Sequence, residues 1–161
     1  MKLFLILSVL LLSAPLKKIQ VAGEYENHFG YKLSLHPDST FDYRSALSKE
    51  WCKGKWTMEE DTLYFAIIPV YDTLRLAGQK DTLLLSFGET PRLLTGADTY
   101  NRNKTHRQRL AMYPKLYFKN NRLYPVDSTG KIDQTRMTAI VTNPRTKKTS
   151  FKKYPLWFEK K

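Results

Sequence analysis

Apolar and polar residues alternate along the chain from Tyr31 onward. Leu33 and Leu35 are separated by the polar Ser34, and Phe41 and Tyr43 repeat the pattern after the turn sequence at 36–39 (His-Pro-Asp-Ser). Because successive side chains of a β-strand point to opposite faces, a period of two indicates strands with one buried face. Turn-forming residues between two such runs predict a hairpin.

The same alternation continues through residue 87, with turn chemistry about every ten residues. Short strands at this spacing are typical of a barrel or sandwich built from consecutive antiparallel hairpins. We expect residues 31–87 to form such hairpins. The apolar residues expected to face inward are Leu33, Leu35, Phe41, Trp56, Leu63, Phe65, Leu74, Leu76, Leu83 and Leu85.

The second half of the chain is less regular. Residues 98–112 lack alternation, and their polar composition predicts a loop or a short helix near residues 100–112. Strands resume at 116–119 and 122–126, where Asn120 and Asn121 suit a tight hairpin turn. Segments 137–142 and 151–158 are the last strand candidates. The predicted fold is all-β, an antiparallel up-and-down barrel or half-barrel.

The first residues predict export from the cytoplasm. Leu3–Leu16 is almost wholly apolar and follows the single charge of Lys2. The run is shorter than the roughly 20 residues that span a bilayer, and it matches the apolar region of a secretory signal. We expect residues 1–22 to be a signal peptide or N-terminal anchor and residues 23–161 to be one domain. The protein would then be secreted or periplasmic, either free or associated with a membrane. The alternative interpretation of the apolar run is a buried N-terminal strand or helix.

Asp-Thr-Leu occurs three times, at residues 61–63, 72–74 and 81–83. Asp accepts local backbone hydrogen bonds, Thr favours the pleat and Leu begins a buried face, so each triplet is interpreted as a strand start. A second interpretation is that the triplets are acceptor sites for O-glycosylation. Some bacterial envelope glycosylation systems use an acceptor sequence of Asp, then Ser or Thr, then a small apolar residue or Thr. The candidate acceptors are Thr62, Thr73, Thr82, Ser39 and Ser128.

The chain also resembles lipocalin-like domains of small bacterial envelope proteins. Gly23-Glu24-Tyr25, the hairpin of residues 33–41, Gly54-Lys55-Trp56 and Asp61-Thr62-Leu63 carry the resemblance, which extends over residues 23 to about 87. It implies a barrel or half-barrel with an apolar interior and transfers no catalytic residue. The leading functional hypothesis is therefore binding of an apolar or amphipathic small molecule inside the barrel. Its proposed interior residues are Trp56, Phe65, Leu76 and Phe87.

Charge is distributed unevenly along the chain. The net charge is +12, and residues 101–161 hold 16 Lys/Arg against 3 Asp/Glu, whereas residues 24–100 hold 8 against 12. Such a surface attracts anionic partners. The alternative function is therefore an interaction module that binds anionic lipid, lipopolysaccharide or glycan of the cell envelope through Lys147, Lys148, Lys152 and Lys153. Export argues against nucleic acid as the partner. Another interpretation is that the basic residues form only a solvated face without a partner.

Motifs of known catalytic sites are missing from the sequence. The three histidines lack metal-ligand spacing, and there is no Gly-x-Ser-x-Gly or Gly-rich phosphate loop. Cys52 is the only cysteine, and we expect it to be a packing residue. The sequence predicts a protein without enzymatic activity, cofactor or metal, although a hydrolase whose residues meet only in the fold is a third possibility.

Overall fold

The computed structural model describes residues 20–96 and 107–161. Within them, eight antiparallel strands form a closed barrel, which confirms the predicted all-β, up-and-down fold. The chain follows the barrel in order, because each barrel strand pairs with the next and the last pairs with the first. The barrel strands are β1 (Gly23–Glu26), β2 (Tyr31–Leu35), β3 (Thr40–Ser45), β4 (Glu50–Glu59), β5 (Thr62–Ile67), β10 (Lys115–Lys119), β11 (Arg122–Pro125) and β14 (Phe158–Lys160).

The connections of an up-and-down barrel alternate between its two ends. In this barrel the two ends carry connections of different length. At one end, here called the closed end, β2–β3, β4–β5 and β10–β11 are joined by tight turns. Asn120 and Asn121 have φ of 51° and 57°, the left-handed conformation that two-residue hairpins need. The other end, here called the open end, carries the β1–β2 and β3–β4 loops and two long insertions.

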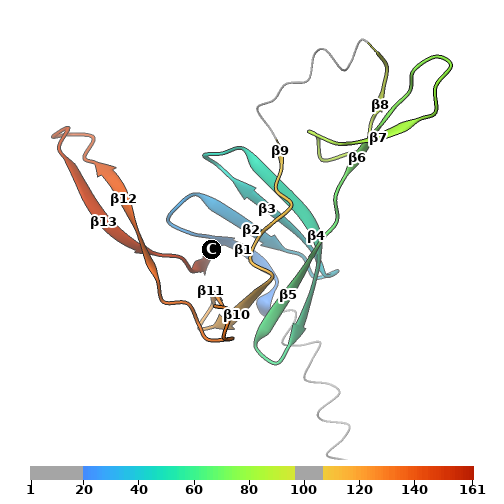
Figure 1. Ribbon diagram of the computed structural model, residues 1–161. Helices are drawn as coiled ribbons and strands as arrows, with labels where there is room; N and C mark the ends of the chain where they lie inside the picture. Colours follow the sequence, from blue (N-terminus) through green and yellow to red (C-terminus); the bar gives the residue numbers. More distant parts are fainter. Residues whose placement is uncertain (1–19, 97–106) are drawn as a thin grey trace, which may run out of the picture.

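The insertions separate β5 from β10 and β11 from β14. The first holds a small sheet of β6 (Tyr71–Leu74), β7 (Thr82–Leu85) and β8 (Leu93–Leu94), followed by β9 (Arg107–Gln108), which pairs parallel with β4. The second is a hairpin of β12 (Arg136–Thr142) and β13 (Thr149–Pro155). Figure 1 shows the small sheet of β6, β7 and β8 and the β12–β13 hairpin projecting away from the barrel.

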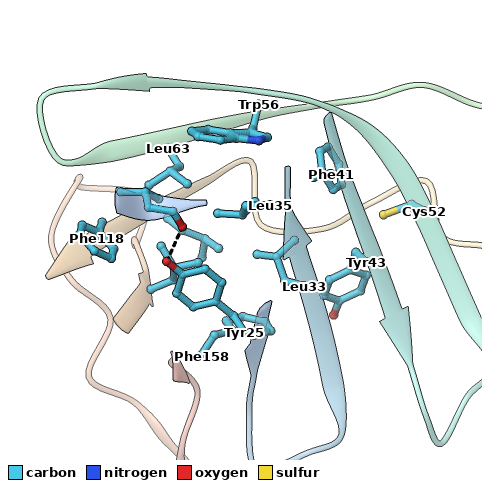
Figure 2. Close-up of a cluster of buried hydrophobic side chains, with 13 residues drawn as sticks. Tyr25, Leu33, Leu35, Phe41, Tyr43, Cys52, Trp56, Leu63, Phe118 and Phe158 are labelled. Atoms are coloured by element: carbon cyan, nitrogen blue, oxygen red, sulfur yellow. Dashed lines mark hydrogen bonds between the residues drawn. The ribbon is translucent and has the colours of Figure 1, made fainter. Parts of the chain in front are cut away.

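Large side chains fill the middle of the barrel (Figure 2). Leu33, Trp56, Leu63 and Phe158 are each 0% exposed, so no space large enough for a water molecule borders them. The Trp56 indole Nε1 donates to the backbone oxygen of His36, 3.2 Å away. The interior is therefore a packed core rather than a hollow.

The closed end is also plugged by the chain that precedes β1. Val21 is fully buried, and the Tyr25 hydroxyl donates to its backbone oxygen at 2.6 Å, the bond drawn in Figure 2. Lys160 Nζ donates to the Gln20 oxygen at 2.6 Å. Of the predicted signal or anchor, residues 1–19 lie outside the described residues.

The prediction of inward residues is confirmed for part of the set. Leu33, Leu35, Phe41, Trp56 and Leu63 are buried in the core, and Phe65 is half-buried against it. The prediction is wrong for the four leucines of the first insertion, because β6 pairs with β7 and β8 and not with β5. These are Leu74, Leu76, Leu83 and Leu85, of which Leu83 is 66% exposed.

Two smaller expectations also change. Thr62 and Thr82 begin strands as predicted, but Asp72 is the second residue of β6, fully buried, with Oδ1 accepting from the Arg92 N–H at 3.0 Å. That triplet is not a strand start. Of the loop or short helix expected near residues 100–112, residues 97–106 lie outside the described residues; 107–108 form β9 and 109–112 contain no helix.

Candidate binding pocket at the open end of the barrel

A pocket of about 310 Å³ opens where the β1–β2 loop, the β3–β4 loop and both insertions meet. Its position follows from the topology, since all four connections leave the barrel at the open end. The lining residues are mostly aromatic or apolar, with one cation and one amide. They are Asn27, Phe29, Tyr31, Tyr43, Leu47, Arg109, Tyr113, Met137 and Leu156.

A stacked pair of tyrosines and an arginine form the centre of the pocket wall. The rings of Tyr31 on β2 and Tyr43 on β3 lie 5.6 Å apart with an interplanar angle of 14°. The Arg109 guanidinium carbon lies 5.6 Å from the Tyr31 centroid and 5.7 Å from the Tyr43 centroid. At these distances the ring quadrupoles attract the cation. The rings and the guanidinium therefore hold one another in position.

The charge beside the pocket is only partly neutralised. Glu50 accepts from Arg107 at 2.8 Å and lies 3.5 Å from Arg109 Nη1. One carboxylate thus faces two guanidinium groups, which remain charged at any physiological pH. Arg109 Nε is fixed by donation to the Ala111 oxygen at 2.6 Å. The excess positive charge favours an anionic ligand group.

Two phenol groups of the pocket, those of Tyr43 and Tyr113, remain neutral hydrogen-bonding groups. Burial raises the pKa of Tyr43 well above its ordinary value, and burial raises the pKa of Tyr113 as well. Both hydroxyls therefore keep their protons at neutral pH and can donate or accept. The pocket combines apolar ring faces, neutral hydroxyls and one guanidinium.

Two further hollows border the first insertion. One of about 330 Å³ is lined mainly by charged residues that include Lys32, Arg44 and Glu89. The other, of about 410 Å³, lies between the β7 end of the small sheet and β9, and Phe87 is its single aromatic residue. Neither combines several rings with a cation as the open-end pocket does.

The four residues predicted to line one apolar interior do not share a site. Trp56 belongs to the packed core, and Phe65 contacts Phe41 edge to face at 5.2 Å. Leu76 and Phe87 lie outside the barrel, after β6 and β7, where the Phe87 oxygen accepts from Trp51 Nε1 at 3.3 Å. The expectation of a common interior is wrong because Trp56 and Phe65 are on barrel strands, whereas Leu76 and Phe87 follow strands of the separate three-stranded sheet.

The four predicted surface lysines lie together on the second insertion. Lys147 and Lys148 are in the turn of the β12–β13 hairpin, and Lys152 and Lys153 are on β13. All four are exposed. They are separate from the pocket, which the base of the same hairpin borders through Met137.

The predicted acceptor hydroxyls are spread over turns and strands. Thr82 and Ser128 are exposed, whereas Ser39, Thr62 and Thr73 are half-buried. Asp127 Oδ1 accepts from both the backbone N–H and the hydroxyl of Thr129, at 2.8 and 2.7 Å, as Asp38 does from Thr40. These hydrogen bonds lower the pKa of both carboxyls. The two Asp-Ser-Thr sequences are turn structures, and their modification stays a prediction.

Comparison with known proteins finds no matching family model, no similar curated protein and no similar solved structure. The resemblance to lipocalin-like domains therefore stays a prediction from the sequence. No three His, Cys, Asp or Glu residues within 20–96 and 107–161 are grouped to hold a metal ion. Over the same ranges, no helix is long and apolar enough to cross a bilayer.

The pocket residues were not identified from the sequence. Arg109 lies in a stretch with no alternation, and Tyr31 and Tyr43 look like ordinary strand residues. Their convergence depends on barrel closure and on the path of the first insertion back to β10. The excess of basic residues after residue 100 was the available signal, but it did not distinguish Arg109 from its neighbours.

Proposed function

We propose that this protein is a non-catalytic binding protein of the cell envelope that holds a small amphipathic anion in the open-end pocket. The observation that carries the proposal is Arg109 beside the stacked rings of Tyr31 and Tyr43. A ligand with an apolar body and one carboxylate, sulfonate or phosphate would place its body on the rings and its anion at the guanidinium. Export, argued from the apolar run at Leu3–Leu16, supplies the envelope part of the proposal.

The size and lining of the pocket support a small ligand. Its volume of about 310 Å³ lies at the lower limit of small-molecule sites, which are mostly apolar with a few placed polar groups. The packed core argues against a ligand in the middle of the barrel, because Leu33 and Trp56 border no free space. Binding at the mouth of the barrel needs no repacking of that core.

A matched pair of fluorescent probes tests the proposal. Anilinonaphthalene sulfonate has a fused apolar ring system and one negative charge, and N-phenylnaphthylamine has the same rings without the charge. We expect the sulfonate to bind more tightly to the full chain, because only it can accept charged hydrogen bonds from Arg109. Such a bond contributes about 1.5–3 kcal/mol, so the Arg109→Gln variant should bind the sulfonate roughly 10- to 100-fold more weakly.

The controls separate pocket chemistry from general charge. Arg75→Gln removes one positive charge outside the barrel, where Arg75 pairs with Asp81 at 2.7 Å, and should leave sulfonate affinity unchanged. N-phenylnaphthylamine affinity should change little in Arg109→Gln and should fall in Phe29→Ala, which removes a pocket ring. Equal loss of both probes in Arg109→Gln, or an equal effect of Arg75→Gln on the sulfonate, would contradict the proposal.

A further inference from the structure

The β12–β13 hairpin forms a sheet of its own. Its strands pair over seven residues each, from Arg136↔Pro155 to Thr142↔Thr149, and with no other strand of the described residues. Its base is held by Tyr154, whose ring lies 4.8 Å from that of His28 and 6.5 Å from that of Phe29. An isolated two-stranded hairpin is only marginally stable in water. A partner surface would therefore stabilise it.

One face of the hairpin presents large apolar side chains to solvent. Ile140 and Phe151 are directly opposed across the strands, so their side chains lie on the same face. They are 69% and 74% exposed. The next pair on this face is Thr138 and Lys153, whereas Met137 and Tyr154 lie on the opposite face, which contacts the barrel. No part of residues 20–96 and 107–161 covers the Ile140–Phe151 pair.

The charge of the hairpin has one sign. Six Lys or Arg residues and no Asp or Glu occur between Arg136 and Pro155. None of the six takes part in an ion pair with a residue of the described ranges. The hairpin is therefore complementary to an anionic surface. Each Lys or Arg near an anionic bilayer strengthens binding by about fivefold.

The arrangement favours a lipid surface over a nucleic acid. Nucleic-acid grooves that bind without sequence preference use several aromatic rings on which successive bases stack. Phe151 is the single aromatic residue between Arg136 and Lys153, and Tyr154 is engaged with the barrel. One ring and one aliphatic side chain among lysines instead match the bilayer interface, where apolar groups enter the headgroup region and cations reach the phosphates.

We infer that the β12–β13 hairpin docks on an anionic lipid bilayer, with Ile140 and Phe151 inserted at the interface and Lys147, Lys148 and Lys153 at the headgroup phosphates; Lys152 lies on the opposite face. Because Met137 at the start of β12 lines the open-end pocket, docking holds that pocket beside the membrane. The inference does not depend on the small-molecule proposal, since no other pocket residue lies on the hairpin strands.

Vesicle flotation tests the inference with the full chain. Wild-type protein should bind vesicles of mixed phosphatidylglycerol and phosphatidylcholine at low salt, bind pure phosphatidylcholine vesicles at least tenfold more weakly, and lose affinity as salt rises. Exchanging Lys147, Lys148 and Lys153 for glutamate should weaken binding by more than about 100-fold. The double variant Ile140→Thr/Phe151→Thr should lose about tenfold or more. Threonine keeps strand propensity, so the hairpin should persist.

Matched controls make the result specific to the hairpin. Leu83→Thr removes an apolar side chain of similar exposure from β7 and should leave vesicle binding unchanged. A polarity-sensitive fluorophore on Phe151→Cys should shift to the blue on vesicles, whereas the same label on Leu83→Cys should not. The native thiol of Cys52 is buried and should remain unlabelled.

Three outcomes would overturn the inference. The first is equal binding of the wild-type protein to neutral and anionic vesicles. The second is vesicle binding by both hairpin variants as tight as that of the wild type. The third is binding to heparin or duplex RNA without binding to vesicles. An unchanged urea unfolding transition of Ile140→Thr/Phe151→Thr, followed by circular dichroism, would show that the variant is folded. Because this control does not use the pocket, failure of the membrane inference stays distinguishable from failure of the pocket proposal.

Discussion

Truncation of Trp56 should remove a large part of the stability of the barrel. The side chain is 0% exposed in the middle of the core and reaches the His36 oxygen with its indole N–H. Trp56→Ala removes roughly 200 Å² of buried apolar surface. At about 25 cal/mol per Å², this lowers the free energy of unfolding by about 5 kcal/mol. Truncations of large aromatic residues in packed cores cost about 3–5 kcal/mol. We expect a loss of about 4–5 kcal/mol, close to the whole stability of many domains.

Urea denaturation followed by circular dichroism measures this loss. Trp56→Phe separates the contributions, because it keeps most of the apolar volume and removes the hydrogen bond to His36; it should cost about 1–2 kcal/mol. Phe151→Ala, which truncates an exposed aromatic side chain, should cost less than about 1 kcal/mol. A loss below about 1.5 kcal/mol in Trp56→Ala would refute the packed core, because only a collapsible or hollow interior tolerates that truncation.

Two further changes test the core at other points. A Cβ at Gly54 would collide with the Ala66 carbonyl oxygen and lie 2.9 Å from Phe41, so Gly54→Ala should cost at least about 2 kcal/mol in urea denaturation; Gly88→Ala, where the nearest atom is 3.8 Å away, should be nearly neutral. Burial raises the pKa of the Cys52 thiol from 9.0 to about 12. The neutral thiol therefore contributes to the free energy of unfolding below pH 9.0, and this contribution is lost as pH rises toward 12. Stability measured against pH should therefore fall less steeply above pH 9.0 in Cys52→Ala than in the wild type, and identical slopes would contradict this.

The alternating pattern predicted the hairpins of the barrel because local contacts determine them. The Leu35↔Phe41 pair and the Asn120–Asn121 turn follow from residues close in sequence. Alternation does not say which sheet a strand joins. Leu74 and Leu76 alternate with polar residues as Leu33 and Leu35 do. The chain nevertheless leaves the barrel after Ile67, and β6 pairs with strands of the insertion.

The pocket could not be predicted because its residues come from distant segments. Tyr31 and Arg109 are brought together only when the first insertion returns to begin β10, and no local pattern encodes that path. The lysines of the hairpin were identified from charge alone, since a run of basic residues is a local signal. Their exposed apolar partner Ile140 was not, because cross-strand register is needed to pair it with Phe151.

The division of the barrel into two ends explains how stability and binding are compatible. At the closed end, tight turns, Val21 and the Tyr25 hydroxyl seal the core, and pairing of β14 with β1 leaves the eight-stranded sheet without a free edge. Closure of the barrel pairs the backbone hydrogen-bonding groups of its strands with one another. The connections at the open end can therefore vary without exposing the core. Long insertions are tolerated at such connections since loop-closure entropy grows slowly with length. The pocket and the hairpin therefore occur at the one end where sequence can change without loss of the barrel.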